Sequence, residues 1–177
     1  MRWAGVAAAV IAGTVDVLYL GIIGSQGASN PQFLRVPFVA AFIALMAICA
    51  ALSSRASAER WRPLLLGTSA AGLLLLGYFA LFSIGLLLLL AGALAMVGLI
   101  GTLSLVWFSP GESGKAAVAA MAAGGAVAAV VVLLAGFALA DFAIRCPARG
   151  VESGSGTAFL GGSYEYSCNN GNLTISR

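Results

Sequence analysis

The segment 63–108 reads PLLLGTSAAGLLLLGYFALFSIGLLLLLAGALAMVGLIGTLSLVWF and contains no charged residue. One helix over these 46 residues would be about 69 Å long at about 1.5 Å per residue. That is more than twice the roughly 30 Å hydrocarbon core of a bilayer. The chain must therefore turn back, and Phe82-Ser83-Ile84-Gly85 is the expected hairpin. A four-span alternative, with one long tilted or re-entrant segment here, stays open.

The composition is typical of a membrane protein. Of the 177 residues, 61% are hydrophobic and 8% are charged, whereas a soluble domain has about 25% charged residues. Mean hydropathy is +1.03. Arg supplies most of the basic residues beside abundant Ala and Gly, a usage that indicates a high-GC bacterium. The net charge of +3 is too small and too scattered to indicate nucleic-acid binding.

Cutting the apolar runs at charged or proline-containing joints predicts an all-α membrane bundle over residues 1–145. Each span needs about 20 residues. The expected spans are 3–24, 36–52, 63–81, 83–108 and 115–141. The first is expected to be retained rather than cleaved as a signal peptide, because Asp16 interrupts its apolar core and apolar character resumes beyond it.

Basic residues near the span ends predict the orientation, because cytoplasmic loops carry an excess of Lys and Arg. With a cytoplasmic N-terminus, five such residues lie inside and three outside, namely Arg2, Arg55, Arg60, Arg62 and Lys115 against Arg35, Arg145 and Arg149. We therefore expect a plasma-membrane protein with an extracytoplasmic C-terminus.

The loop between the second and third spans, with Glu59, Arg60 and Arg62, is expected to anchor the bundle at the cytoplasmic side. Trp61 would lie at the level of the lipid headgroups. Contact with acidic lipids is a further role for these basic residues.

The chain after the last span, residues 146–177, changes to a Gly-, Ser- and Asn-rich composition. Short patches at 157–160, 163–167 and 173–176 predict a small β-hairpin or meander, and Asn170-Gly171 is a strong hairpin signal. Cys146 and Cys168 lie on the oxidising side in this topology, so a disulfide closing this cap is expected, with two free thiols as the alternative. Cys49, within the second span, is expected to be an inert core thiol.

Asp16 is the most informative single residue, because an ionisable group inside a span is costly and usually faces a partner, water or a substrate path. It shares a helix face with Ala8 and Ala12 and is expected to point into the bundle. A polar cluster on the outer side would comprise Asp16, Arg35, Asp141 and Arg145. The structural interpretation is an ion pair or packing contact, and the functional one is a proton or cation site.

Small residues recur every fourth position in the fifth span and permit close helix packing. They are Ala116, Ala120, Gly124 and Ala128. The first span carries a comparable stripe of Gly5, Ala9 and Gly13. A five-helix bundle offers limited interior for both, so one of the two is expected to contact a partner helix.

No catalytic, cofactor or metal constellation is evident. The chain has no His, the commonest zinc ligand and a common general base. The loop 109–116 superficially resembles a phosphate-binding loop, but Ser109 and Ala116 replace the Gly and the Ser or Thr that the motif requires. We therefore expect no cofactor, metal or nucleotide.

Three functional classes follow from this pattern. The favoured one is a non-enzymatic accessory or scaffold subunit of a larger membrane complex, associating with another membrane protein or with copies of itself. The alternative is a small channel or a solute or ion transporter that uses Asp16 and an outer polar vestibule. An enzyme is not expected, because paired intramembrane acids and a thiol beside a base are missing.

Overall fold

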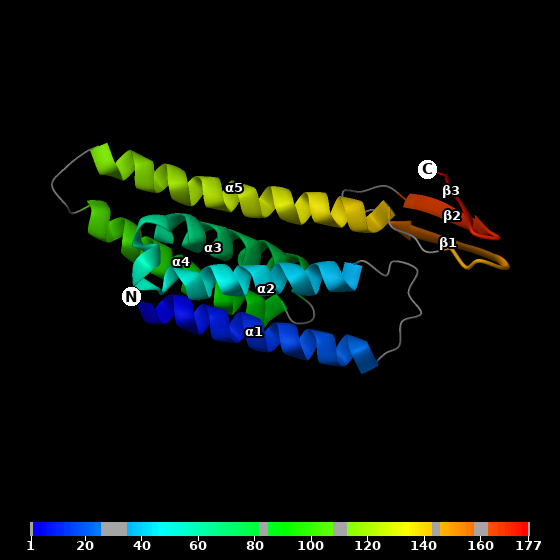
Figure 1. Ribbon diagram of the computed structural model, residues 1–177, viewed down its shortest axis with the longest axis horizontal. Coiled ribbons are helices and arrows are strands. Elements are labelled where there is room, and N and C mark those ends of the chain that lie inside the picture. The colour runs from blue at the N-terminus through cyan, green and yellow to red at the C-terminus, as the bar shows by residue number, and fades with distance from the viewer. Residues whose placement is uncertain are drawn as a thin grey trace.

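The computed structural model describes residues 2–25, 35–81, 85–107, 113–142, 146–157 and 163–176. Within these ranges, five α-helices run alternately up and down one elongated bundle (Figure 1). They are α1 (Arg2–Ser25), α2 (Arg35–Ser53), α3 (Arg62–Phe79), α4 (Gly85–Trp107) and α5 (Ser113–Phe142). A short 3-10 helix, η1 (Ala56–Trp61), joins α2 to α3.

The prediction of five long apolar helices is confirmed, and each is long and apolar enough to cross a membrane. Their ends lie within two residues of the expected span boundaries. The uncharged segment 63–108 is divided between α3 and α4, which pack side by side, so it is not one long helix. Residues 82–84 of the expected hairpin lie outside the described residues.

Helix α3 lies at the centre of the bundle, packed against α2, α4 and α5. Helix α1 packs on α2 and α4, and α5 lies on the opposite side of the bundle, mainly against α3 (Figure 1). The largest fully buried apolar side chains come from all five helices and form one core: Val15, Ile43, Met46, Leu73, Leu88 and Leu133.

Glycines let these helices approach closely. A Cβ on Gly67 of α3 would collide with the carbonyl oxygen of Ala122 in α5. At the α3–α4 contact, a Cβ on Gly92 would lie 2.8 Å from Cγ of Leu74. The helices therefore pack backbone against backbone at positions where no larger residue fits.

The C-terminal residues form an antiparallel three-stranded meander beyond the end of α5 (Figure 1). Its strands are β1 (Val151–Thr157), β2 (Ser163–Asn169) and β3 (Asn172–Ser176), in the order β1-β2-β3. Asn170 and Gly171 form the β2–β3 turn with φ of 48° and 86°, as a type I′ hairpin requires. The Cys146–Cys168 disulfide is confirmed and joins the central strand to a residue four positions beyond the last residue of α5.

The first strand differs from the prediction, which places it at 157–160; residues 158–160 lie outside the described part of the chain. Strand β1 instead runs through the sequence VESGSGT, which has low β-propensity. Gly154 pairs with Tyr166 across the strands, and a Cβ there would meet the Tyr166 hydroxyl at 2.6 Å. The Tyr166 ring covers Gly154, so cross-strand packing rather than local propensity defines this strand.

Candidate functional site

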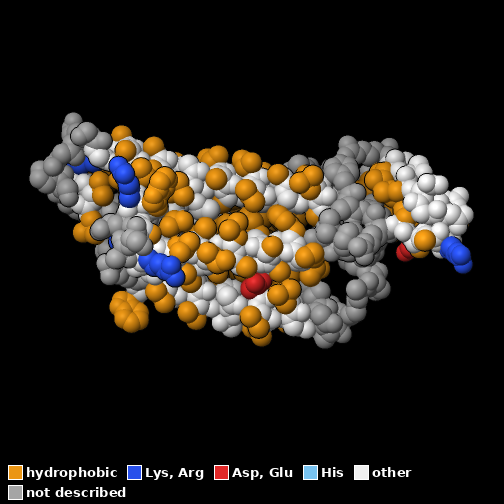
Figure 2. Space-filling model, in the orientation of Figure 1, with side chains coloured by type: hydrophobic (Ala, Val, Ile, Leu, Met, Phe, Trp, Pro, Cys, Tyr) orange, Lys and Arg blue, Asp and Glu red, His pale blue; other side chains and the backbone are white. Residues whose placement is uncertain are grey.

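Asp16 lies at the edge of the packing face of α1. Ala12, one turn before Asp16, is fully buried. Of the two residues that flank Asp16, Val15 is 2% exposed and Val17 is 71% exposed. Asp16 itself is half-buried. The side chain therefore lies where the buried face of α1 gives way to the outer surface. In the space-filling view, an acidic side chain interrupts the largely apolar surface of the helices (Figure 2).

The Asp16 carboxylate is incompletely satisfied. Its Oδ1 atom is buried and has no hydrogen-bond partner within the part of the chain that the structure describes. The side chains of Arg35, Asp141 and Arg145, its expected neighbours in the outer polar cluster, lie outside the described residues. That cluster stays a prediction. Burying an unpaired carboxylate oxygen is costly, so a polar or cationic group is expected to approach it.

The small-residue stripe of α5 lies on the outside of the bundle. Ala116, Ala120, Gly124 and Ala128 are all exposed. A Cβ added at Gly124 would have nothing within 4 Å. This stripe therefore makes no close contact inside the described bundle at Gly124 and presents a surface of small side chains.

The face of α5 that packs internally is adjacent to that stripe. Ala122, Ala129 and Leu133 are at most 7% exposed, and a Cβ on Gly125 would collide with the carbonyl oxygen of Leu64. The fourfold spacing in the sequence identified the exposed stripe and missed this one. No local signal separates the two faces, because Leu133 on the internal face is matched by the exposed Val132, which follows Ala128 at the same fourfold spacing.

The comparable stripe of α1 is partly used within the bundle. A Cβ on Gly5 would lie 2.8 Å from Ser53 Oγ and 3.0 Å from the carbonyl oxygen of Ala50, both in α2. Ala9 packs beside the same cluster, while Gly13 has open space around it. Of the two stripes, the one on α5 is the more fully exposed.

A small cavity with a mixed polar and apolar lining lies between the helix ends opposite the sheet. It has a volume of about 30 Å³, and its lining includes Gly5, Ser53, Ser54, Arg62, Gly98 and Thr102. Arg62 Nε donates to the carbonyl oxygen of Ser53 at 2.9 Å, while Nη2 is buried without a hydrogen-bond partner in the described residues. The sequence indicated anchoring and a contact with acidic lipids for Arg62, and nothing in its spacing shows that it folds back onto α2.

The other candidates carry less. Cys49 is a free, half-buried thiol in α2. In the loop that superficially resembles a phosphate-binding loop, residues 109–112 lie outside the described residues. Among described residues, no group of three or more His, Cys, Asp or Glu could hold a metal ion.

Comparison of the chain with protein-family models, with curated proteins and with solved structures found no match. Any functional assignment therefore depends on the geometry of this molecule.

Proposed function

We propose that this chain is a non-enzymatic membrane protein that serves as an accessory or scaffold subunit of a larger membrane complex. Its five helices would span a bacterial plasma membrane with the N-terminus in the cytoplasm and the sheet outside. The observation that carries the proposal is the exposed stripe of small residues on α5, which continues along about three helical turns from Ala116 to Ala128.

The chemistry of this stripe favours a protein partner over lipid. Helix association in a membrane depends on close van der Waals packing, which small residues allow. Ala and Gly offer little side-chain surface to lipid, whereas Leu, Ile and Val lower the free energy of insertion by about 0.3 to 0.6 kcal/mol each. A stripe in which Gly124 has nothing within 4 Å is shaped for the backbone of another helix.

The sheet supports the same proposal. All residues of β3 are exposed, and β3 is an edge strand of the three-stranded sheet. Its sequence NLTIS contains neither charge nor proline, the usual protections of an exposed edge. Such an edge can accept an added strand from another chain.

The proposal is tested by purifying the tagged protein in a mild detergent from its native membrane and reading the particle mass by native mass spectrometry. A stoichiometric larger membrane subunit is the expected result. A homogeneous monomer, or an assembly of this chain alone, would contradict the accessory role.

The transporter alternative has one observation in its favour, the buried and unpartnered Oδ1 of Asp16. A coupling carboxylate in a span has this character. Liposome flux of candidate cations, with the isosteric Asp16→Asn variant as control, tests it. Flux that Asp16→Asn abolishes would favour transport, whereas a variant that only lowers yield or stability assigns Asp16 to packing.

A further inference from the structure

We propose that the cavity at the end of the bundle opposite the sheet binds a phosphate oxygen of a phospholipid headgroup, with the Arg62 guanidinium as its donor. The proposal rests on membrane insertion of the helices but not on the accessory role. It concerns residues of α1 to α4 and leaves the α5 stripe aside.

The Arg62 guanidinium is held in place but only partly paired. Its Nε donates to the Ser53 carbonyl oxygen at 2.9 Å, which fixes the side chain across the end of α2. Its Nη2 atom is buried and lacks a partner among the described residues. A guanidinium stays charged at any physiological pH, and a neutral carbonyl does not compensate a partly buried charge.

The other polar groups of the lining do not fill this need. Ser53 Oγ, Ser54 Oγ and Thr102 Oγ1 each donate at 2.6 Å to the backbone carbonyl oxygen of a residue three or four positions earlier. The described lining contains no carboxylate. Arg62 is therefore the lining residue whose side chain is incompletely paired, and an anion is the ligand that also balances its charge.

The size of the cavity limits what enters it. A volume of about 30 Å³ exceeds the roughly 10–15 Å³ that one water needs and is too small for a whole headgroup. One phosphate oxygen fits, with the rest of the headgroup remaining outside. Arginine is well suited to such a contact because its N–H groups match phosphate geometry.

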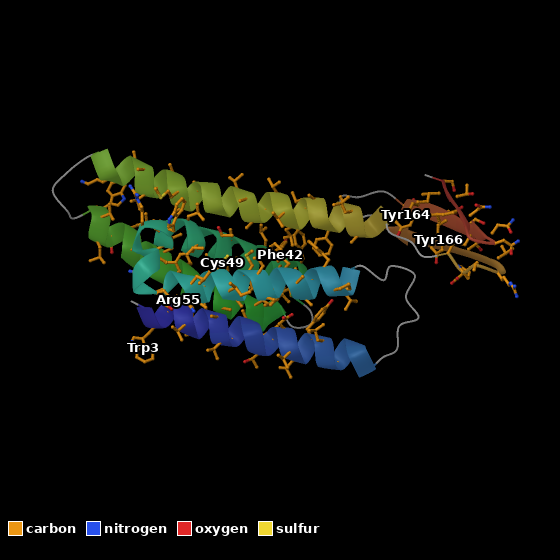
Figure 3. The ribbon with its side chains drawn as sticks, in the orientation of Figure 1. Trp3, Phe42, Cys49, Arg55, Tyr164 and Tyr166 are labelled. Carbon is orange, nitrogen blue, oxygen red and sulfur yellow. A yellow bond between two sulfur atoms is a disulfide. The ribbon has the colours of Figure 1, made fainter. Side chains whose placement is uncertain are left out.

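The position of the cavity relative to the membrane favours a lipid as the source of the phosphate. All three tryptophans of the chain, Trp3, Trp61 and Trp107, are 83%, 57% and 63% exposed. Each begins or ends a helix at this end of the bundle, where Figure 3 labels Trp3 and Arg55. Tryptophan concentrates at the headgroup level of a membrane, so Arg62 beside Trp61 would lie among the phosphates.

Neighbouring charge favours a headgroup with net negative charge. Arg55 and Arg60 are exposed on the segment that leads into α3, and Lys115 follows at the start of α5. Basic residues at this level attract anionic lipids by about 1 kcal/mol each. Phosphatidylglycerol should therefore bind better than phosphatidylcholine of the same acyl chains.

The test measures lipid binding to the full chain in mild detergent by native mass spectrometry. The added probes are dioleoyl phosphatidylglycerol, dioleoyl phosphatidylcholine and inorganic phosphate. Arg62→Gln should weaken phosphatidylglycerol binding at least tenfold. Arg60→Gln removes an exposed cation from the same segment and should change binding less than threefold. Equal binding of the two lipids by the unaltered chain, or normal binding by Arg62→Gln, would overturn the proposal.

A second variant covers the case in which Arg62→Gln does not fold. A Cβ on Gly98 would lie 3.5 Å from Ala4 Cβ and 3.6 Å from Leu66 Cδ2, both ordinary contacts. Gly98→Ala should therefore fold, keep the Arg62–Ser53 hydrogen bond and narrow the cavity, weakening phosphatidylglycerol binding severalfold. Normal binding by folded Gly98→Ala would contradict the proposed site.

The inorganic phosphate arm separates the two sources of phosphate. Displacement of the lipid by millimolar phosphate would assign the cavity to a free anion and overturn the lipid assignment. Failure of membrane insertion would appear separately, as protein that does not float with vesicles in a density gradient. A chain that floats but shows no dependence on Arg62 would refute the site while leaving the proposed function intact.

Discussion

Helices α4 and α5 have the same mean hydropathy yet expose different surfaces. Helix α4 exposes large aliphatic side chains, with Leu86, Leu90 and Val97 between 55% and 71% exposed. The first half of α5 exposes Ala116, Ala120, Gly124 and Ala128. Hydropathy alone would assign both faces to lipid. The size of the exposed side chains separates a surface suited to acyl chains from one suited to another helix.

The second half of α5 resembles α4 in its exposed surface. Beyond Ala128, the side chains of Val131, Val132 and Leu139 are 47% to 73% exposed. The small-residue surface is therefore confined to the half of α5 near the end opposite the sheet. A partner helix that crosses α5 at an angle would need only this half.

The largest expected effect comes from placing a leucine on the internal face of α5, compared with a leucine on its exposed face. Gly125→Leu should cost about 3 kcal/mol of folding free energy or more, because a Cβ there would collide with the Leu64 carbonyl oxygen and lie 2.6 Å from Thr68 Oγ1. Gly124→Leu, one residue earlier, should melt as the unaltered chain does, since nothing lies within 4 Å. Thermal unfolding in detergent, followed by circular dichroism, compares them. Similar melting of the two variants would mean that α5 is rotated relative to this structure.

The sheet follows α5 in the chain. Breaking the Cys146–Cys168 disulfide tests whether the helices depend on this bond. Cys146→Ser should destabilise the sheet by about 3 kcal/mol on the chain-entropy model, since the bond joins residues 22 apart. Amide hydrogen exchange should rise in 151–176 while the helices stay protected. Cys49→Ser, which alters the free thiol, serves as the control. Exchange that rises equally in α5 would show that the disulfide holds the helix in place.

The exposed stripe itself is tested by Ala120→Leu with Gly124→Leu. This pair should leave the fold intact and reduce the co-purified partner at least tenfold, a loss of about 1.4 kcal/mol in binding, because the leucines hold the partner backbone away. Ala93→Leu, at an exposed position of α4, is the matched control and should retain the partner. Retention of the partner by the α5 pair would move the interface elsewhere.

The sequence was sufficient to predict the helices and the disulfide, but it was insufficient to predict which face of a helix packs inside the bundle. Charges and proline delimit most of the apolar runs, and the length of 63–108 requires a turn within it, so the ends of all five helices were predicted to within two residues. Which side of α5 faces inward could not be, because Ala122 and Ala120 are chemically the same residue. Only the packing of α3, where Gly67 lies against Ala122, distinguishes them.

The candidate sites were less predictable for a similar reason. Asp16 is visible in the sequence as a charge inside an apolar run. Arg62 has the appearance of an ordinary flanking cation, and only the fold brings it across to Ser53. Strand β1 has low β-propensity, and its pairing with β2 and its contact with Tyr166 determine its position. Properties set by contacts distant in sequence are the ones that pattern analysis misses.

The smallest effect is expected at the large exposed side chains of α4. Leu90→Ala changes a side chain that is 55% exposed on α4 and should alter the free energy of unfolding by less than about 0.5 kcal/mol, because it opens no cavity. Leu88→Ala, two residues earlier and fully buried, should cost about 2 to 5 kcal/mol. Chemical unfolding in mixed micelles measures both. The informative readout is the partner: if Leu90→Ala released it while the fold held, large side chains would be the interface, and the small residues of α5 would need another explanation.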